Sequence, residues 1–174
     1  MPFRTPRPEA PPLPPVLEFL RALWSLNHAL EVTSSAMHRT SGVTAQQRMI
    51  LRIVGHLGTV GAGTLSALLH VHPGTLSAAL RRLEGRGLLS RQRSENDARQ
   101  VLVALTTQGE QLLKTSEGSV ERAAASVLDG SDAASVEHAL QLLEQMTRTL
   151  EARLAERREG SMEGAREGAP TEQA

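Results

Sequence analysis

The spacing of apolar residues changes along the chain and separates predicted helices from predicted strands. Apolar residues three or four positions apart, the spacing of one helix face, predict helices over about 15–38, 45–57, 65–69, 73–84, 107–128 and 136–154. Over 89–93 and 101–105 apolar and polar residues alternate instead, which predicts a β-hairpin around the polar turn 94–98. This order of elements indicates a mostly helical α+β fold.

Two of the predicted helices begin with a capping-box pattern. Thr44 and Gln47 precede the second helix, and Thr107 and Glu110 open the fifth. In such a box the Thr hydroxyl accepts from the amide three residues on, and the Gln or Glu side chain reaches back to the cap. Pro15 suits the first turn of the first helix, because proline needs no amide donor there.

The last helix carries the seam that a partner helix would need. Its apolar or small residues are separated by alternating steps of four and three, as in a coiled coil. They are Val136, Leu140, Leu143, Thr147, Leu150 and Leu154. Together with the long first helix, this seam predicts a homodimer.

Two terminal segments are expected to be disordered tails. They are residues 1–14, which are rich in proline, and 158–174, which are rich in Gly, Glu and Arg.

Composition narrows the classes of protein that remain. Hydrophobic residues make up 40% of the 174 residues and aromatic residues only 2%, so Leu, Val, Ala and Met must build the core. The chain has no Cys, which excludes a disulfide framework, a thiolate metal cluster and a cysteine redox switch. It has no apolar run of signal-peptide or membrane-spanning length, so we expect a cytoplasmic protein without a membrane partner.

Charge is segregated along a chain whose formal net charge is zero. Residues 72–99 hold six Arg against three acidic residues, whereas 100–150 hold seven acidic residues against three basic ones. The fourth helix and the hairpin therefore carry the excess of positive charge. A cationic surface is what binding to the phosphates of a nucleic acid requires.

Four short segments in this order resemble the MarR family of winged helix-turn-helix transcriptional regulators. They are residues 65–77 (LSALLHVHPGTLS), 83–89 (LEGRGLL), 97–99 (DAR) and 105–109 (LTTQG). The resemblance covers about 16–155. It implies one MarR-like unit over 15–157, with a winged helix-turn-helix at 44–106 and dimerisation helices at 15–40 and 107–157. It also implies a homodimer that binds an inverted repeat in double-stranded DNA.

The fourth helix has the width and the polarity needed to enter the major groove of DNA. Leu76, Leu80 and Leu83 fall on one face and are predicted to point into the core. The opposite face and the helix start are predicted to contact DNA through Gly74, Thr75, Ser77, Ala78, Arg81 and Arg82. The amides at the start of the helix also suit a phosphate.

The hairpin adds a second set of candidates. Arg91 and Arg93 are two residues apart on a strand, so they share a face and suit contact with the DNA backbone. Asp97 and Arg99 match the family's Asp-x-Arg pattern, and the resemblance implies that Arg99 reaches the minor groove while Asp97 orients a nearby arginine. The same pair could simply brace the hairpin.

Two alternatives to DNA binding follow from the same residues. Arginines on a helix often form no more than a solvated face. A winged helix can also serve as a protein-interaction or scaffolding module, which would favour apolar or acidic residues on the outer face of the fourth helix. Thr75, Ser77, Arg81 and Arg82 argue against that module. We expect no enzyme, because phosphate-binding loops, nucleophile elbows and carboxylates bracketed by strands are missing from the sequence.

The resemblance further implies a cleft between the dimerisation helices and the DNA-binding part, where family members commonly bind anionic aromatic effectors. The candidate lining residues are Trp24, His28, His38 and Arg48. Trp24 also lies on the apolar stripe of the first helix, which favours a place in the core. None of the six histidines forms the His-x-x-x-His spacing of a zinc site, so we expect neither a metal nor a cofactor.

Overall fold

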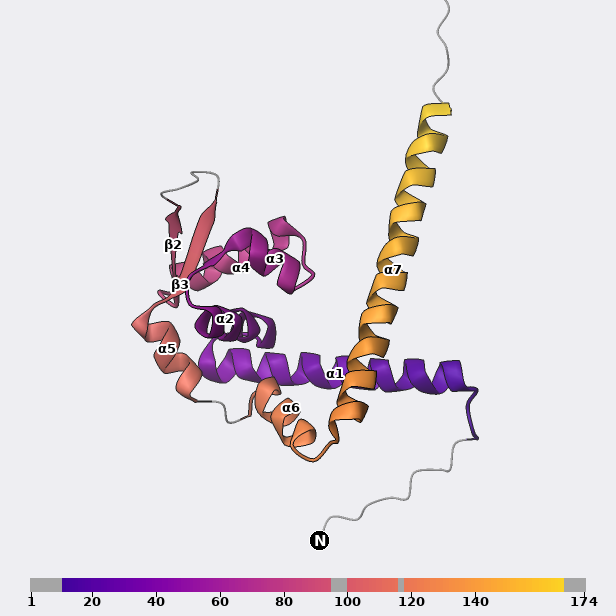
Figure 1. The fold of residues 1–174 in the computed structure, drawn as a ribbon, viewed down its shortest axis with the longest axis horizontal. Helices are drawn as coiled ribbons and strands as arrows, with labels where there is room; N and C mark the ends of the chain where they lie inside the picture. Colours follow the sequence, from indigo (N-terminus) through magenta and orange to yellow (C-terminus); the bar gives the residue numbers. More distant parts are fainter. Residues whose placement is uncertain (1–10, 95–99, 116–117, 168–174) are drawn as a thin grey trace, which may run out of the picture. The chain divides into compact units, whose positions relative to one another are not determined.

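A computed structural model of the chain describes residues 11–94, 100–115 and 118–167, with side chains up to residue 157. In chain order the elements are α1 (Pro15–Ser41), α2 (Ala45–Leu57), β1 (Val60–Gly61), α3 (Ala62–Leu68), α4 (Pro73–Gly85), β2 (Leu89–Arg93), β3 (Val101–Leu105), α5 (Thr107–Lys114), α6 (Val120–Leu128) and α7 (Ala133–Glu167) (Figure 1). The mostly helical α+β class with a winged helix-turn-helix is confirmed.

The chain forms two compact units, residues 1–124 and 125–174. This division falls within α6 and differs from the single unit predicted over 15–157. The first unit contains α1 to α5, the small sheet and the start of α6. The second unit consists of the rest of α6 and α7. Each unit is described by itself below.

Aliphatic side chains alone build the core of the first unit. Fully buried residues come from α2, α3, α4, β3 and the position before β2, and include Ile50, Leu51, Val54, Leu65, Leu80, Leu83, Leu88 and Val103. Burial of each of these side chains stabilises the folded state by roughly 1.5–3 kcal/mol. Leu76, Leu80 and Leu83 are all buried, as the spacing in α4 predicts.

The sheet has three antiparallel strands in the order β1-β3-β2. The predicted hairpin is confirmed as β2 and β3, with Leu89 opposite Leu105 and Arg93 opposite Val101. Strand β1 was not predicted, because two residues, Val60 and Gly61, are too few to show an alternation. Val60 pairs with Val103, so β1 closes the sheet beside α3.

One of the two predicted capping boxes is correct and the other is displaced. Thr44 accepts from the amide of Gln47 at 3.2 Å, and the Gln47 side chain accepts from the amide of Thr44 at 3.0 Å. At α5 the cap is Thr106 instead of Thr107, and its hydroxyl accepts from the amide of Gly109 at 3.1 Å. Gly109 packs directly against the carbonyl oxygen of Leu88, where a Cβ would not fit.

The helix predicted over 107–128 is in fact two helices. Arg48 and Arg52 of α2 donate to main-chain carbonyls at the end of α5: Arg48 to Leu112 at 3.0 Å and Arg52 to Leu113 at 3.0 Å. Arginine side chains that cap the last carbonyls stabilise a helix end. Helix α5 therefore ends at Lys114, and α6 begins at Val120.

The second unit is dominated by α7. Asp132 caps it, with its Oδ1 accepting from the amide of Ser135 at 2.9 Å. The helix continues to Glu167, into the segment that the sequence analysis expects to be a tail. Between residues 125 and 157 every side chain is exposed or half-buried, including the seam leucines Leu140, Leu143, Leu150 and Leu154. Within this unit, therefore, nothing covers the seam.

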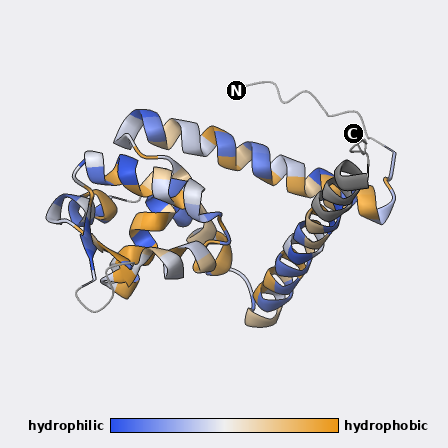
Figure 2. Ribbon diagram, turned by 90° about the horizontal axis from the view of Figure 1, so that it is seen from above, coloured by the Kyte–Doolittle hydropathy of each residue, from blue (hydrophilic) through white to orange (hydrophobic). Residues whose placement is uncertain are grey.

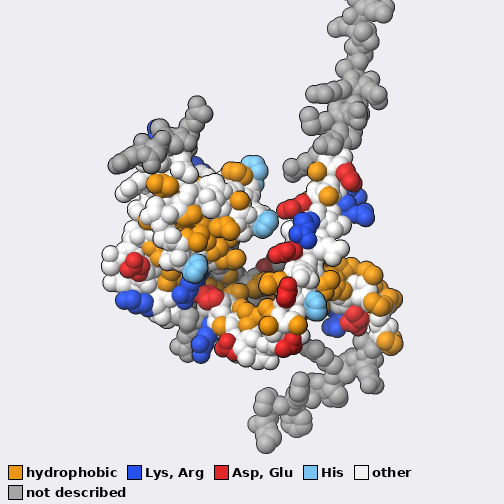
Figure 3. Space-filling model, in the orientation of Figure 1, with side chains coloured by type: hydrophobic (Ala, Val, Ile, Leu, Met, Phe, Trp, Pro, Cys, Tyr) orange, Lys and Arg blue, Asp and Glu red, His pale blue; other side chains and the backbone are white. Residues whose placement is uncertain are grey.

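Helix α1 likewise presents apolar residues to solvent. It lies along α2, and Met37 near its C-terminal end is its buried residue (Figure 1). Apolar residues alternate with polar ones along its length (Figure 2), and hydrophobic side chains gather over its N-terminal part (Figure 3). Trp24 is 71% exposed, which corrects the prediction that it belongs to the core. Among the described residues no helix is long and apolar enough to span a membrane.

Candidate nucleic-acid interface

The start of α4 is shaped by the sequence His72-Pro73-Gly74. Pro73 occupies the first helical position, and the backbone of His72 is extended with φ −59° and ψ 138°. The imidazole Nδ1 of His72 accepts from the amide of Gly74 at 3.1 Å and so caps the helix. The proline and the cap therefore fix the residue at which α4 begins, shortly after the end of α3.

The outer face of α4 divides the predicted contacts into two groups. Gly74, Thr75, Arg81 and Arg82 are exposed, whereas Ser77 and Ala78 are half-buried. The guanidinium groups of Arg81 and Arg82 make no hydrogen bond or ion pair with any other described residue, so their donors are available to a partner. The interface predicted on this helix is thus accessible, with positive charge on its second half.

The two arginines of strand β2 differ in their surroundings. Arg93 is exposed. Arg91 is half-buried, and its Nη1 lies 3.5 Å from Oε2 of Glu84 on α4, while its Nε is buried without an acceptor in the described part of the chain. Arg91 therefore ties the wing to α4, and only Arg93 has the freedom expected of a backbone contact. Asp97 and Arg99 lie outside the described residues.

Comparisons with known proteins match the winged part of the chain. Residues 43–101 match the model of the MarR family. Residues 43–101 are a MarR-family domain. The organic hydroperoxide resistance transcriptional regulator of Bacillus subtilis is 36% identical over 67 residues, which cover 38% of this chain and 46% of that protein. An uncharacterised helix-turn-helix transcriptional regulator of the same organism is 27% identical over 105 residues, covering 60% of this chain and 62% of that protein.

The chain thus spans about half the length of the curated relatives that it matches. Among solved structures, the Staphylococcus aureus MepR–DNA complex has a TM-score of 0.62 at 18% identity, covering 75% of this chain and 97% of that one. At this identity the likeness concerns the fold. The matched relatives are named as regulators, in agreement with the expectation that the chain is not an enzyme.

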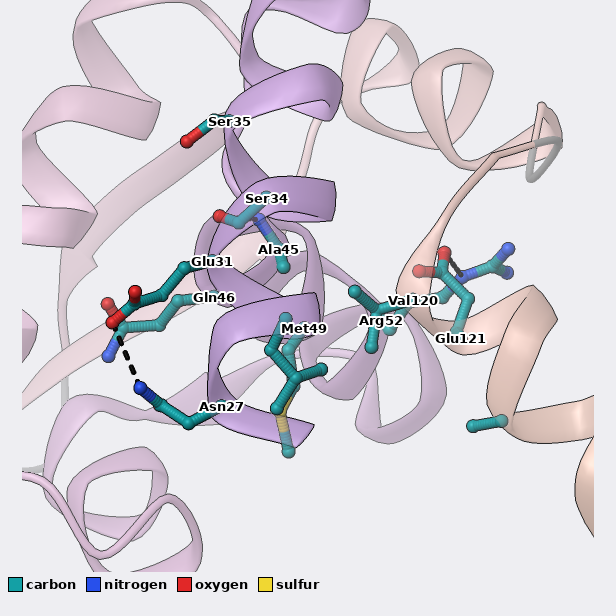
Figure 4. Close-up of a pocket in the computed structure, with 12 residues that line it drawn as sticks. Asn27, Glu31, Ser34, Ser35, Ala45, Gln46, Met49, Arg52, Val120 and Glu121 are labelled. Carbon is teal, nitrogen blue, oxygen red and sulfur yellow. Dashed lines mark hydrogen bonds and ion pairs between the residues drawn. The ribbon is translucent and has the colours of Figure 1, made fainter. Parts of the chain in front are cut away.

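A cavity of about 1010 Å³ lies beside this MarR-family domain, among α1, α2 and the start of α6 (Figure 4). Its lining residues are Asn27, Leu30, Glu31, Ser34, Ser35, Ala45, Gln46, Met49, Arg52, Val120, Glu121 and Ala124. In the close-up, Asn27 and Glu31 form one polar wall and Arg52 and Glu121 the other, and each pair is hydrogen-bonded.

The predicted effector residues do not line this cavity. Trp24, His28 and His38 are exposed on α1. Arg48 is buried, and its guanidinium is occupied by Glu121 and by the carbonyls of Leu112, Leu113 and Thr115. The described residues contain no cluster of His, Asp and Glu suited to a metal ion. Arg52, four residues after Arg48, was missed, although that spacing places both arginines on one face of α2.

The pKa of Glu121 is displaced by these contacts. Burial would raise it, but the hydrogen bond and positive charge of Arg48, with help from Ser119, outweigh burial and lower the pKa of Glu121 below its ordinary value of 4.5. Glu121 is therefore a carboxylate at neutral pH. One wall of the cavity thus carries a fixed ion pair between α2 and α6.

Proposed function

We propose that the chain is a transcriptional regulator that binds an inverted-repeat operator in duplex DNA as a homodimer and represses the promoter that it covers. The observation that carries this proposal is the division of α4, with Leu76, Leu80 and Leu83 buried and Arg81 and Arg82 exposed without partners among the described residues. A helix held in this way presents donors to base edges and phosphates.

The proposed DNA contacts are those of α4 and of the wing. They are Gly74, Thr75, Ser77, Ala78, Arg81, Arg82 and Arg93, with Asp97 and Arg99 beyond the described residues and Arg91 as a brace of the wing. The MepR–DNA complex, which shares the fold, supports an arrangement in which a winged helix of this kind meets DNA. In a two-fold dimer the half-sites would lie about 34–36 Å apart, one turn of the double helix.

The homodimer would cover apolar surface that one copy leaves exposed. The α1 stripe includes Val16, Leu17, Leu20, Leu23 and Trp24, and α7 carries the seam from Val136 to Leu154. The proposal also includes release of the DNA by a small effector. The cavity between α1, α2 and α6 supports this part, because it is large enough for such a molecule and touches both the winged helix and α1.

A gel-shift titration of the duplex upstream of the protein's own coding region, at 50 and 200 mM salt, tests the proposal. A shift that weakens by about 10³-fold or more with salt is expected from a dimer that neutralises six or more phosphates. A protein-interaction module would give no shift at either salt concentration. The exposed arginines of α4 favour the first outcome over the second.

A further inference from the structure

We propose that Arg86 is a positioning residue that fastens the recognition helix α4 to the end of α1, and thereby restricts the half-site spacing that the dimer accepts in DNA. This inference rests on the proposed function, because it concerns how two copies of α4 are held against one operator. Arg86 falls within the cationic stretch of the sequence, but its contacts are to the protein.

The geometry joins two helix ends through one guanidinium. Arg86 directly follows α4 as its C-cap residue. Its Nη1 donates to the carbonyl of Gly42, and its Nη2 donates to the carbonyl of Ser41 at 3.3 Å. Ser41 is the last residue of α1 and Gly42 is its cap. The C-terminal ends of α1 and α4 are therefore bridged although the residues are 44 and 45 positions apart in the chain.

The chemistry of this bridge favours arginine. Carbonyls at the C-terminal end of a helix lack donors within the helix and carry the negative end of its dipole. A planar guanidinium offers several donors in a fixed plane and can serve two carbonyls together, whereas a lysine ammonium acts as a single point charge. Arg86 thus supplies donors to carbonyls at the end of α1. The same contact fixes the position of its own backbone relative to α1.

Gly42 leaves the room that the bridge occupies. Its φ of +73° is the left-handed conformation that favours glycine. A Cβ at this position would also lie 2.9 Å from Cζ of Arg86 and 3.0 Å from its Nη1. Any other residue at position 42 would therefore displace the guanidinium as well as strain the backbone.

The consequence concerns the placement of α4 relative to the proposed dimer surface. Within the winged helix, α4 is packed on α3 and β2. Arg86 adds a direct link to α1, the helix whose exposed apolar stripe is the proposed contact between copies. Without the link, the leucines of α4 stay packed in the core, but the helix can pivot at its C-terminal end. A dimer with pivoting recognition helices accepts half-sites over a wider range of separations.

The test uses the full-length chain and duplexes that carry an operator selected by the wild-type protein from random sequence. In one duplex the half-sites keep the selected spacing, and in the others one or two base pairs are inserted or removed. Arg86→Gln and Arg86→Lys are compared with Arg39→Gln. Arg39 lies in the last turn of α1 and is exposed, and its guanidinium makes no hydrogen bond or ion pair with any described residue. Arg86→Gln and Arg39→Gln each remove one positive charge near the same helix end.

For Arg86→Gln we expect about fivefold weaker binding to the selected spacing and a flattened preference among spacings, a change of about 1 kcal/mol in discrimination. Arg86→Lys should fall between it and the wild type, and Arg39→Gln should keep the wild-type preference. Gly42→Ala should flatten the preference in the same way, and adding Arg86→Gln to it should change little more, because both changes remove one contact.

Two results would overturn the inference, and only one of them would also overturn the proposed function. If the wild type selects no duplex, the proposed function fails and the role of Arg86 fails with it. If the wild type binds and Arg86→Gln retains its spacing preference, the inference fails alone and DNA binding stands. Each variant is titrated at a temperature well below its melting temperature, measured at the same protein concentration, so that every protein is folded in the titration.

Discussion

Arg48 of α2 and Glu121 of α6 form an ion pair across 73 positions of sequence, and the Arg48 side chain is only 3% exposed. The other donors of Arg48 are taken by the carbonyls of Leu112, Leu113 and Thr115. A buried guanidinium in which each of the three nitrogens donates a hydrogen bond avoids the cost of an unpaired buried charge. This side chain therefore holds α2, the end of α5 and the start of α6 together.

Replacing Arg48 should destabilise the chain strongly. Arg48→Met removes the donors of several part-buried carbonyls and leaves Glu121 without its main partner, so the free energy of unfolding should fall by roughly 3 kcal/mol. Urea denaturation at a fixed protein concentration measures this loss.

Arg52→Met is the matched control for Arg48→Met. Arg52 contacts Glu121 at 3.3 Å and lies on the same face of α2, but its side chain is 43% exposed. Exposed ion pairs are worth about 1 kcal/mol or less. Equal losses for Arg48→Met and Arg52→Met would contradict the structural role assigned to Arg48.

The Glu121 carboxylate should make stability depend on pH in the acid range. Because its pKa in the folded chain is lower than its ordinary value of 4.5, the folded state binds fewer protons there than the unfolded state. The contribution is complete above about pH 4.5 and is lost as pH falls through the lowered pKa. The difference in unfolding free energy between the wild type and Glu121→Gln should therefore be constant near pH 7 and shrink below pH 4.5.

Glu31→Gln serves as the control for that measurement. Glu31 lines the opposite wall of the same cavity, and its carboxylate accepts from Asn27 on its own helix at 3.1 Å. This contact lies within α1 and does not join α2 to α6. If Glu31→Gln and Glu121→Gln gave the same dependence on pH, the bridge from Arg48 to Glu121 would not be its source.

The sequence predicted those parts of the fold that depend on local patterns. The leucines of α4, the alternation of β2 and β3, and the Thr44 box each depend on residues a few positions apart, and all three were predicted correctly. The break between α5 and α6 was missed, because it depends on arginines more than 60 residues away that take up carbonyls of the helix end. The helical spacing of apolar residues continues through such a break, so spacing alone does not reveal it.

The candidate site was predictable to a similar extent. Exposure of Arg81 and Arg82 follows from the burial of the opposite face of α4. The engagement of Arg91 with Glu84 and of Arg86 with Ser41 and Gly42 depends on how strand, helix and loop pack, which spacing does not encode. For the same reason the cavity is lined by Glu31, Arg52 and Glu121 instead of the four residues predicted from α1 and α2.

Trp24 provides an intrinsic probe of the proposed dimer. It is the single tryptophan of the chain and is 71% exposed in one copy. Burial in a partner should shift its fluorescence emission to shorter wavelength as protein concentration rises, because the indole leaves water. The shift should follow the dimer fraction measured by sedimentation. An emission maximum typical of exposed tryptophan in a sample that sedimentation finds dimeric would place the interface away from this part of α1.

His72 should contribute to the stability of α4 through its cap. His72→Ala removes the acceptor of the Gly74 amide and should cost about 1 kcal/mol, whereas His72→Asn keeps a short acceptor and should lose little. Thermal unfolding of the three proteins, measured in the same buffer, makes the comparison. Equal melting temperatures for the wild type and the Ala variant would show that the contact contributes nothing.

Arg81 and Arg93 should affect DNA binding in different ways. Arg81 projects from α4, the proposed groove helix, so Arg81→Ala should lose about 1–3 kcal/mol on the selected operator, lose little on unrelated duplex, and relax the preference at one base position. Arg93 lies on the wing strand and is proposed to meet phosphate, so Arg93→Ala should weaken all duplexes alike and reduce the salt slope by about 1. Arg122→Ala, an exposed arginine of α6, is the control for net charge. Binding curves on selected and shuffled duplexes at several salt concentrations separate the two effects, and a uniform loss for both Arg81 and Arg93 would leave base reading to other residues.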